Sequence, residues 1–384
     1  MSVATDLVTR RFTELTGQPP AGVWFAPGRV NLIGEHTDYN DGFVMPFALD
    51  LGATVAASAR ADEHVRVDSV DLKETVELEV LRPYDQPSAT TGWAAYLAGV
   101  VWALRQAGHP VGGVDLVLAS DVPIGAGLSS SAAIECAVVA ACCDLFGLEI
   151  APIDRAKLAR VAENQFVGAP TGLLDQAAST LCQQDAALFL DCRSLETVSV
   201  PLPLGEQGLE ILVLDTHSPH SHVDGEYAER RTTCEAAAAA LGVSALRDVT
   251  DLDDALSRLD DELQRMRTRH VVTEDERVLQ AVELGRAGKL RELGPLLDAS
   301  HASMRDDFQI TVPTVDVAVE TAKQHGALGA RMTGGGFGGC IIALCETGQG
   351  DQLGQKVAEA FAAADFNAPS WFTVTPEQGA RRIS

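Results

Sequence analysis

The stretch GRVNLIGEHTDYNDG, residues 28–42, joins an apolar, β-prone run to a dense group of polar side chains. The run VNLIG is typical of a buried strand, and the turn after it carries Glu35, His36 and Asp38. Arg29, just before the run, offers a planar fork that neutralises and orients oxyanions. Mixed donors and acceptors at this spacing suit the vicinal hydroxyls of a sugar, because a polar site rejects an epimer that leaves a partner unpaired. A simple surface turn with Asx-turns is the alternative.

A second polar segment, VPIGAGLSSSAAIECAVVAA, covers residues 122–141. Glycines allow unusual dihedral angles, and the serines stand where an apolar helix begins. The free N–H groups and the dipole of a helix start favour a phosphate. The segment lacks the lysine of a Walker loop, and a strand–helix turn capped by serine is the alternative. The candidate phosphate-binding residues are Gly125, Ala126, Gly127, Leu128, Ser129, Ser130 and Ser131.

A third segment, RMTGGGFGGCIIAL, covers residues 331–344 and contains the spacing G-x-G-x-x-G. The dinucleotide fingerprint with this spacing requires a helix at its last glycine. The β-branched run CIIALC follows instead and predicts a strand. We therefore predict a hairpin whose glycine backbone approaches another loop or a ligand.

Two further carboxylates flank a break between two predicted helices, 154–166 and 173–182. Glu163 is a hard oxygen ligand that could hold Mg²⁺ together with a serine hydroxyl. Asp175 lies in the first turn of the second helix, where the helix dipole favours an ionised carboxylate. A favourable acid at a helix start, without chemistry, is the alternative for Asp175.

Composition narrows the class of protein. The 384 residues, 46% hydrophobic and 22% charged, are typical of a globular chain with about two domains. A formal charge of −25 argues against nucleic acid and anionic membranes as partners, but not against a small anionic ligand. The eight cysteines form no C-x-x-C pair, so we interpret them as reduced core residues. No signal peptide or membrane span is expected, and we predict a cytoplasmic protein.

The predicted elements alternate between strands and helices without strict βαβ order, which indicates two mixed α/β layers. Composition shifts toward charged helices after about residue 203, so we predict domains at 1–203 and 204–384. The predicted helices are 3–16, 93–106, 131–146, 154–166, 173–182, 224–241, 251–268 and 274–286. The predicted strands are 22–34, 43–59, 64–71, 75–80, 113–120, 186–192 and 340–345.

Taken in order, these segments resemble the GHMP small-molecule kinase family over nearly the whole chain. The stretch at 28–42 resembles the galactokinase signature within that family, PIGAGLSSSAA resembles the family's ATP loop, and GGGFGG its third motif. SMRDDFQITVPTVD, residues 303–316, is similar to a further galactokinase stretch. Each motif alone is moderately specific, whereas four in the family order are strongly so.

The resemblance implies an α+β fold with an S5-domain-2-like N-terminal domain, a ferredoxin-like C-terminal domain and an active site in the cleft between them. It implies transfer of the γ-phosphoryl group of ATP to the anomeric hydroxyl of α-D-galactose, the first committed step of galactose catabolism. The cofactor would be Mg²⁺. The partners would be galactose and ATP, without nucleic acid or a membrane, and the protein would be a monomer.

The resemblance also implies roles for single residues. Arg29 and Asp175 match the catalytic pair. Residues 125–131 match the ATP loop. The sugar-binding positions are matched by Glu35, His36, Asp38 and Tyr227. The magnesium ligands are matched by Ser131 and Glu163.

The sequence departs from the family pattern at two places, and two alternative functions stay open. TGLLDQ stands where the family usually has a Cys-Gly-Ile-Met-Asp-Gln run, which changes the surroundings of Asp175. His217, His220 and His222 could bind a transition metal, although we favour a solvated loop. A sister kinase for N-acetylgalactosamine or arabinose is the nearest rival. A galactose sensor without turnover is the other, and the intact Ser131 argues against it.

Overall fold

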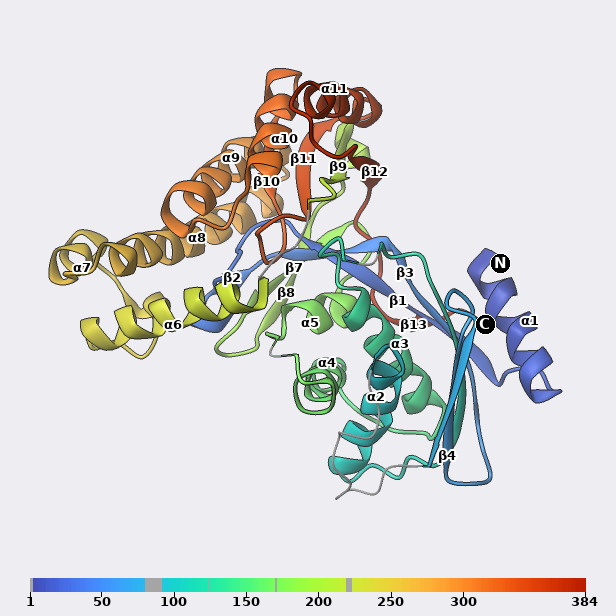
Figure 1. The fold of residues 1–384 in the computed structure, drawn as a ribbon. Coiled ribbons are helices and arrows are strands. Elements are labelled where there is room, and N and C mark those ends of the chain that lie inside the picture. The colour runs from blue at the N-terminus through green and yellow to red at the C-terminus, as the bar shows by residue number, and fades with distance from the viewer. Residues whose placement is uncertain (1–2, 80–91, 124, 170, 219–222) are drawn as a thin grey trace.

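The computed structural model describes residues 3–79, 92–123, 125–169, 171–218 and 223–384, which form two lobes (Figure 1). The N-terminal lobe, residues 3–201 with the last strand of the chain, contains a six-stranded sheet in the order β13-β1-β3-β6-β4-β5 and a three-stranded sheet in the order β2-β7-β8. Its strands are β1 (Gly22–Asn31), β2 (Phe43–Val44), β3 (Pro46–Ala59), β4 (His64–Ser69), β5 (Glu74–Glu79), β6 (Val114–Ser120), β7 (Ala186–Asp191), β8 (Thr197–Pro201) and β13 (Arg381–Arg382). Its helices are α1 (Val3–Thr16), α2 (Ala94–Gln106), α3 (Ser130–Leu145), α4 (Pro152–Val161) and α5 (Leu174–Leu181).

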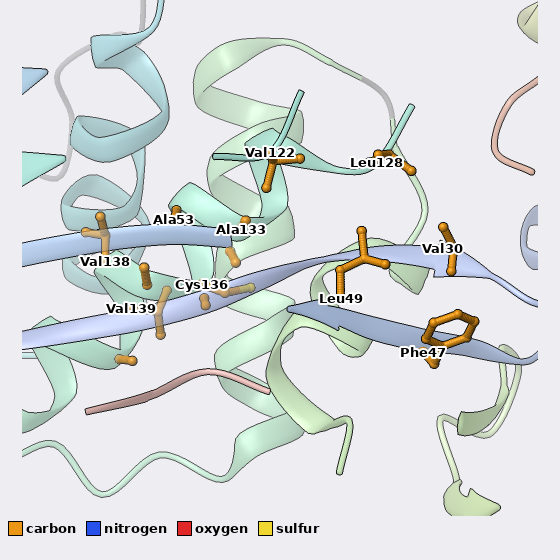
Figure 2. Packing of buried hydrophobic residues seen from close by; sticks show 14 of the residues in the cluster. Val30, Phe47, Leu49, Ala53, Val122, Leu128, Ala133, Cys136, Val138 and Val139 are labelled. Atoms are coloured by element: carbon orange, nitrogen blue, oxygen red, sulfur yellow. The ribbon is translucent and has the colours of Figure 1, made fainter. Parts of the chain in front are cut away.

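Helices cover both faces of the six-stranded sheet, which explains why its central strands are apolar on both sides. Ala56 of β3 and Val117 of β6 cluster with Phe12 of α1. Their neighbours Val55 and Leu116 point the other way and join the cluster formed with α2 and α3. This two-residue alternation is the side-chain period of a strand. Figure 2 shows part of the cluster formed with α2 and α3, with Ala53 of β3 near Ala133 and Cys136 of α3.

The C-terminal lobe, residues 209–374, has a four-stranded antiparallel sheet in the order β10-β11-β9-β12. Its strands are β9 (Leu209–Asp215), β10 (Gly329–Met332), β11 (Cys340–Glu346) and β12 (Ser370–Val374). Its helices are α6 (Val223–Leu241), α7 (Leu252–Arg258), α8 (Glu262–Arg286), α9 (Leu293–Ser303), α10 (Pro313–Gln324) and α11 (Gly350–Ala363). The fold is therefore α+β, as predicted. Within the described part of the chain, no helix is long and apolar enough to cross a bilayer.

The two faces of the C-terminal sheet belong to different cores. Leu212 and Ile341 face a cluster that also contains residues of α6, α10 and α11. Val213 and Ile342 face the opposite way, into the same cluster as the N-terminal lobe's β1, β3, α2 and α3. The largest apolar core thus runs through both lobes without a break.

One helix prediction was wrong. We expected separate helices at 251–268 and 274–286, whereas the chain breaks earlier and α8 runs unbroken from Glu262 to Arg286. Asp261 caps α8, because its Oδ1 accepts a hydrogen bond from Gln264 N at 3.0 Å. Val271 and Val272 lie in the gap that was predicted between the two helices, and both are buried within α8, so burial outweighs the low helix propensity of valine.

The C-terminus of the chain returns to the N-terminal lobe. After β12, residues 381 and 382 form β13, which pairs with Phe25 and Trp24 of β1. The predicted domain boundary at residues 203 and 204 lies in the connection between β8 and β9 and stays a prediction.

Candidate active site

A bulge in β1 brings Arg29 to the glycine- and serine-rich loop. The pairing of β1 with β3 shifts its register between Pro27 and Arg29. Arg29 N donates to Leu128 O at 3.1 Å, and a Cβ on Gly28 would lie 2.6 Å from that same oxygen. Only glycine lets the strand come this close to the loop.

Arg29 and Asp175, which are distant in sequence, form an ion pair at the loop. Asp175 Oδ1 lies 2.8 Å from Arg29 Nε and 2.6 Å from Nη2. Arg29 Nη1 donates to Gly127 O at 2.6 Å, and Ser129 Oγ donates to Asp175 Oδ2 at 2.6 Å. The arginine side chain is 9% exposed and the aspartate 24%, so the carboxylate is the member of the pair that a ligand can reach.

Asp175 keeps one acceptor position for such a ligand. A carboxylate offers about four lone-pair positions. Arg29 occupies two on Oδ1, and Ser129 one on Oδ2. Asp175 lies in the first turn of α5, as predicted, where the helix dipole favours its charge.

The predicted phosphate loop has left-handed backbone at three positions. The φ angles are 80° at Gly125, 76° at Gly127 and 59° at Ser129, and α3 begins at the next residue. Ala126 and Leu128 point into the main core, so only their backbone groups remain for a ligand. The loop therefore presents N–H groups and the start of α3 beside the Arg29–Asp175 pair.

The third glycine-rich segment is a hairpin, as predicted, because β10 pairs antiparallel with β11. A Cβ on Gly334 would lie 3.4 Å from Gly127 O, so the hairpin approaches the phosphate loop. At Gly336, with φ of 89°, a Cβ would lie 2.7 Å from Ile310 O. The glycines thus permit three backbone segments to converge.

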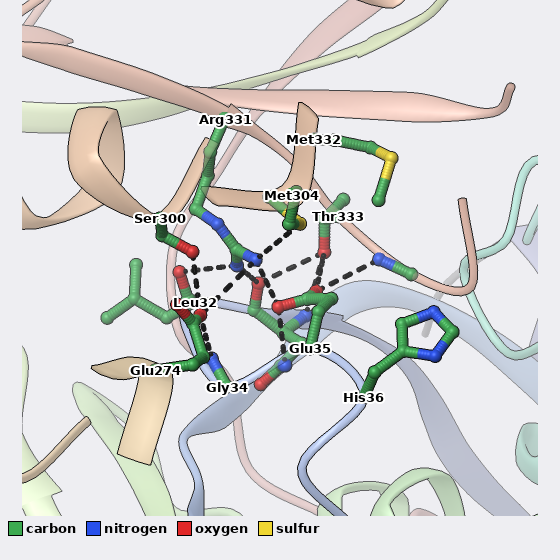
Figure 3. A network of polar contacts seen from close by, with 12 residues as sticks. Leu32, Gly34, Glu35, His36, Glu274, Ser300, Met304, Arg331, Met332 and Thr333 are labelled. Atoms are coloured by element: carbon green, nitrogen blue, oxygen red, sulfur yellow. Dashed lines mark hydrogen bonds and ion pairs between the residues drawn. The ribbon is translucent and has the colours of Figure 1, made fainter. Parts of the chain in front are cut away.

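Glu35 and His36, which follow β1, both contact this hairpin, and Figure 3 shows the contacts of Glu35. Gly334 N donates to Glu35 Oε1 at 3.0 Å, and Arg331 contacts Oε2. His36 Nε2 lies 3.0 Å from Gly335 O, an acceptor, and so carries the proton, which leaves Nδ1 to accept from the Tyr39 hydroxyl at 2.6 Å. Burial lowers the pKa of His36 to about 3, which keeps the ring neutral.

Asp38 and Tyr227 complete the wall of a cavity of about 380 Å³ that Arg29, Asp175, Glu35 and His36 also line. Burial and, secondarily, the nearby charge of Asp175 raise the pKa of Asp38 to about 6. Burial also raises the pKa of Tyr227, so its hydroxyl stays protonated. At Gly172, also on the wall, a Cβ would lie 2.0 Å from Asp38 Oδ2. The structure thus brings the predicted catalytic and sugar-binding residues around one cavity.

Ser131 and Glu163 meet beside this cavity. Ser131 Oγ donates to Glu163 Oε1 at 2.7 Å, while Oε2 accepts from Thr171 Oγ1 at 2.7 Å and from Gln176 Nε2 at 2.6 Å. Burial raises the pKa of Glu163, and the described residues place no lysine or arginine in an ion pair with it. The Ser131 hydroxyl and the Glu163 carboxylate are hard oxygen ligands, and the buried charge of Glu163 has no basic partner among the described residues. Such a pair fits a divalent cation such as Mg²⁺.

Sequence reasoning missed several residues that position the site. Gln176 also donates to Glu135 Oε2 at 3.2 Å, deep in the core. Because Gln176 directly follows Asp175 in the sequence, its position could have indicated a role in the site. Arg331 begins the third motif, but nothing in the local pattern indicated that it reaches Glu35. Glu274 lies on α8 with no recognisable motif.

The histidine segment gives no sign of a metal centre where it is described. His217 Nδ1 lies 2.8 Å from Ala368 O and Nε2 lies 3.0 Å from Ser370 Oγ. His220 and His222 lie outside the described residues. Among the residues described, no three histidine, cysteine or acidic side chains gather as a metal site.

Comparisons with known proteins agree with this geometry. The galactokinase galactose-binding signature matches residues 10–59, the GHMP kinases N terminal domain residues 95–183, and the GHMP kinases C terminal domain residues 279–363. The chain is 53% identical to a galactokinase of Streptomyces coelicolor, with 98% of each chain covered. It is 49% identical to a galactokinase of Streptomyces lividans, with 95% of this chain and 92% of the relative covered.

Solved structures show the same relationship. The crystal structure of Lactococcus lactis galactokinase complexed with galactose matches with a TM-score of 0.92 at 32% identity, covering 99% of this chain and all of that one. Methanococcus jannaschii mevalonate kinase shares the fold, with a TM-score of 0.66 at 18% identity over 94% of this chain and 98% of that one. On its sequence, its fold and the arrangement of its cavity, the chain belongs to the galactokinases of the GHMP kinase family.

Proposed function

We propose that the protein transfers the γ-phosphoryl group of ATP to the anomeric hydroxyl of α-D-galactose and releases ADP and α-D-galactose 1-phosphate. The observation that carries this proposal is the Arg29–Asp175 pair, which stands between a polar cavity and a phosphate loop. Membership of the galactokinases supports galactose as the sugar.

In this proposal, Asp175 accepts a hydrogen bond or the proton of the anomeric hydroxyl on its free Oδ2 position. The anomeric oxygen then attacks the γ-phosphorus, and the bond between that phosphorus and the β–γ bridging oxygen breaks. Arg29 keeps Asp175 ionised and offsets charge on the transferred group. Phosphoryl transfer depends mostly on such alignment and electrostatics.

The remaining wall residues hold the sugar. Glu35 and Asp38 accept hydrogen bonds from its hydroxyls, and the protonated Tyr227 hydroxyl can donate one. His36 has both ring nitrogens engaged within the protein, so it shapes the wall with its ring, which lies 5.1 Å from that of Tyr227.

ATP binds through the backbone N–H groups of residues 125–131 and the start of α3. Ser131 and Glu163 would hold Mg²⁺ through their side-chain oxygens. When bound there, the ion neutralises charge on the phosphates of ATP.

A coupled assay of ADP release with galactose, ATP and Mg²⁺ tests the function. We expect turnover with galactose, slower turnover with N-acetylgalactosamine and arabinose, and a sugar 1-phosphate as the product in ³¹P NMR. A folded protein that binds galactose and ATP without releasing ADP would instead be a sensor. Faster turnover with another sugar would identify a sister kinase.

Galactose affinity should depend on pH through Asp38. Because its pKa is raised to about 6, above the ordinary value of 3.8, the ionised acceptor is present at neutral pH and is lost as the pH falls through 6. The KM for galactose should therefore rise by roughly tenfold between pH 7.5 and pH 5. The matched variant Asp38→Asn should have a high KM that changes much less across this range. A wild-type KM that is the same at both pH values contradicts the assignment.

Magnesium dependence should reveal the role of Glu163. Glu163→Gln preserves the shape of the side chain but removes its charge, so the free Mg²⁺ needed for half-maximal rate should rise by about tenfold or more. The KM for galactose is the internal control and should change by less than about twofold. An unchanged Mg²⁺ requirement would remove Glu163 from the metal site.

We also propose that the enzyme acts as a cytoplasmic monomer. All eight cysteines are free, which supports a reducing compartment. Light scattering during size-exclusion chromatography tests the monomer, which should have a mass near 40.6 kDa.

A further inference from the structure

A buried group of charges lies directly behind Glu35, between the two lobes (Figure 3). Arg331 of β10 and Glu274 of α8 are completely buried, and Glu35 is 3% exposed. Such charges are costly to bury unless they are paired. Their position behind the cavity wall points to a role in the site as well as in the fold.

Arg331 connects the sugar-binding loop to the C-terminal lobe. Its Nη2 contacts Glu35 Oε2, and its Nη1 donates to Asn31 O at 3.2 Å and to Leu32 O at 2.9 Å. On the other side, Glu274 Oε1 lies 3.9 Å from Nη2. One guanidinium therefore fixes both the carboxylate of Glu35 and the backbone that carries it.

The carboxylate of Glu274 is itself held by hydrogen bonds. Its Oε1 accepts hydrogen bonds from Gly34 N at 2.9 Å and from Ser300 Oγ at 2.6 Å, and its Oε2 accepts from Arg277 Nε at 2.7 Å. Burial raises the pKa of Glu274, but the charges of Arg277 and Arg331 outweigh burial and lower it to about 2. Glu274 is thus a permanent anion that holds Arg331.

The hydrogen bonds of Glu35 leave a single acceptor position. Oε2 accepts from Asn31 Nδ2 at 2.9 Å and from Arg331, which fills both of its positions. Oε1 accepts from Gly334 N at 3.0 Å. The Thr333 hydroxyl lies 3.4 Å from Oε1 but donates at 3.0 Å to Asn31 O instead. One position on Oε1 remains for a ligand in the cavity.

We propose that Arg331 is a positioning residue for sugar binding, which holds Glu35 so that its one free acceptor faces a hydroxyl of the substrate. The inference rests on the proposed function, since the hydroxyl is that of the sugar. Arg331 does not itself line the cavity, and therefore acts through Glu35.

A double-mutant cycle tests the inference with Arg331→Met, Glu35→Gln and the double variant. Arg331→Met should raise the KM for galactose, and its calorimetric Kd, by about tenfold or more, because Glu35 loses its orienting partner. kcat should fall by less than about threefold, and the KM for ATP should not change. In the Glu35→Gln background, Arg331→Met should change the galactose KM and Kd by less than about twofold.

Arg265→Met is the matched control, because Arg265 also lies on α8 but pairs with Glu262, outside the network of Glu274, Arg331 and Glu35. It should leave the galactose KM within about twofold of the wild-type value.

If Arg331→Met does not fold, Arg331→Lys takes its place in the cycle, with a severalfold rise in KM expected. Equal effects of the Arg331 substitution with and without Glu35 would overturn the inference. Absence of galactose turnover in the wild type would overturn the proposed function instead, and the galactose Kd values would still decide the cycle.

Discussion

Asp175→Asn should lower kcat by about 10²- to 10⁴-fold while galactose and ATP still bind. The amide preserves the size of the side chain but cannot take up the proton of the anomeric hydroxyl. It also disrupts the pairing with Arg29, whose Nε and Nη2 both meet Oδ1. Steady-state kinetics and calorimetric binding of galactose measure the two effects separately. The KM for ATP should change by less than about threefold, because the amide oxygen can still accept a hydrogen bond from the Ser129 hydroxyl of the phosphate loop.

Asp154→Asn is the matched control for this substitution. Asp154 also lies in the first turn of a helix, α4, but it is exposed and pairs with Lys157, at 2.9 Å. The same chemical change there should leave kcat unchanged. A kcat for Asp175→Asn within tenfold of the wild-type value would show that this carboxylate is neither the base nor an essential positioner.

Arg29→Met should reduce kcat by about 10²- to 10³-fold and, unlike Asp175→Asn, should also raise the KM for ATP. The guanidinium bridges two parts of the site, because it holds Asp175 and also donates to Gly127 O at 2.6 Å. Its loss therefore removes a positive charge beside the transferred group and releases the phosphate loop. Arg29→Lys should restore little activity, since an ammonium group lacks the planar fork that reaches both partners.

Arg66→Met is the control for an arginine on the same sheet. Arg66 lies on β4 and pairs with Asp115 at 2.9 Å. Its kinetic constants should match those of the wild type. If Arg29→Met changes only the KM for galactose, the arginine binds sugar and takes no part in phosphoryl transfer.

Sequence reasoning grouped candidate site residues most readily where chemistry-bearing residues stand together in a motif. Glu35, His36 and Asp38 are neighbours in the chain, and they line one cavity. The convergence of Arg29 on Asp175 depended on the family resemblance, because no local pattern relates two residues so far apart. Arg331 and Glu274 were not predicted, since each comes from a separate element and their contacts exist only when the two lobes meet.

The limits of local reasoning are clearest at α8 and at His36. Val271 and Val272 lie in the gap that was predicted between two helices, but both are buried and continue a single helix. His36 was expected among the sugar-binding positions. Tyr39 and Gly335 occupy both nitrogens, and the partner from Gly335 lies on a distant hairpin that the local sequence does not reveal.

The single core that joins β1, β3 and α3 to Val213 and Ile342 has a consequence for how the molecule melts. Neither half can lose its structure without exposing apolar surface of the other to water. The protein should therefore denature in one cooperative transition, and a nucleotide bound in the cleft should raise its single midpoint temperature for both halves together.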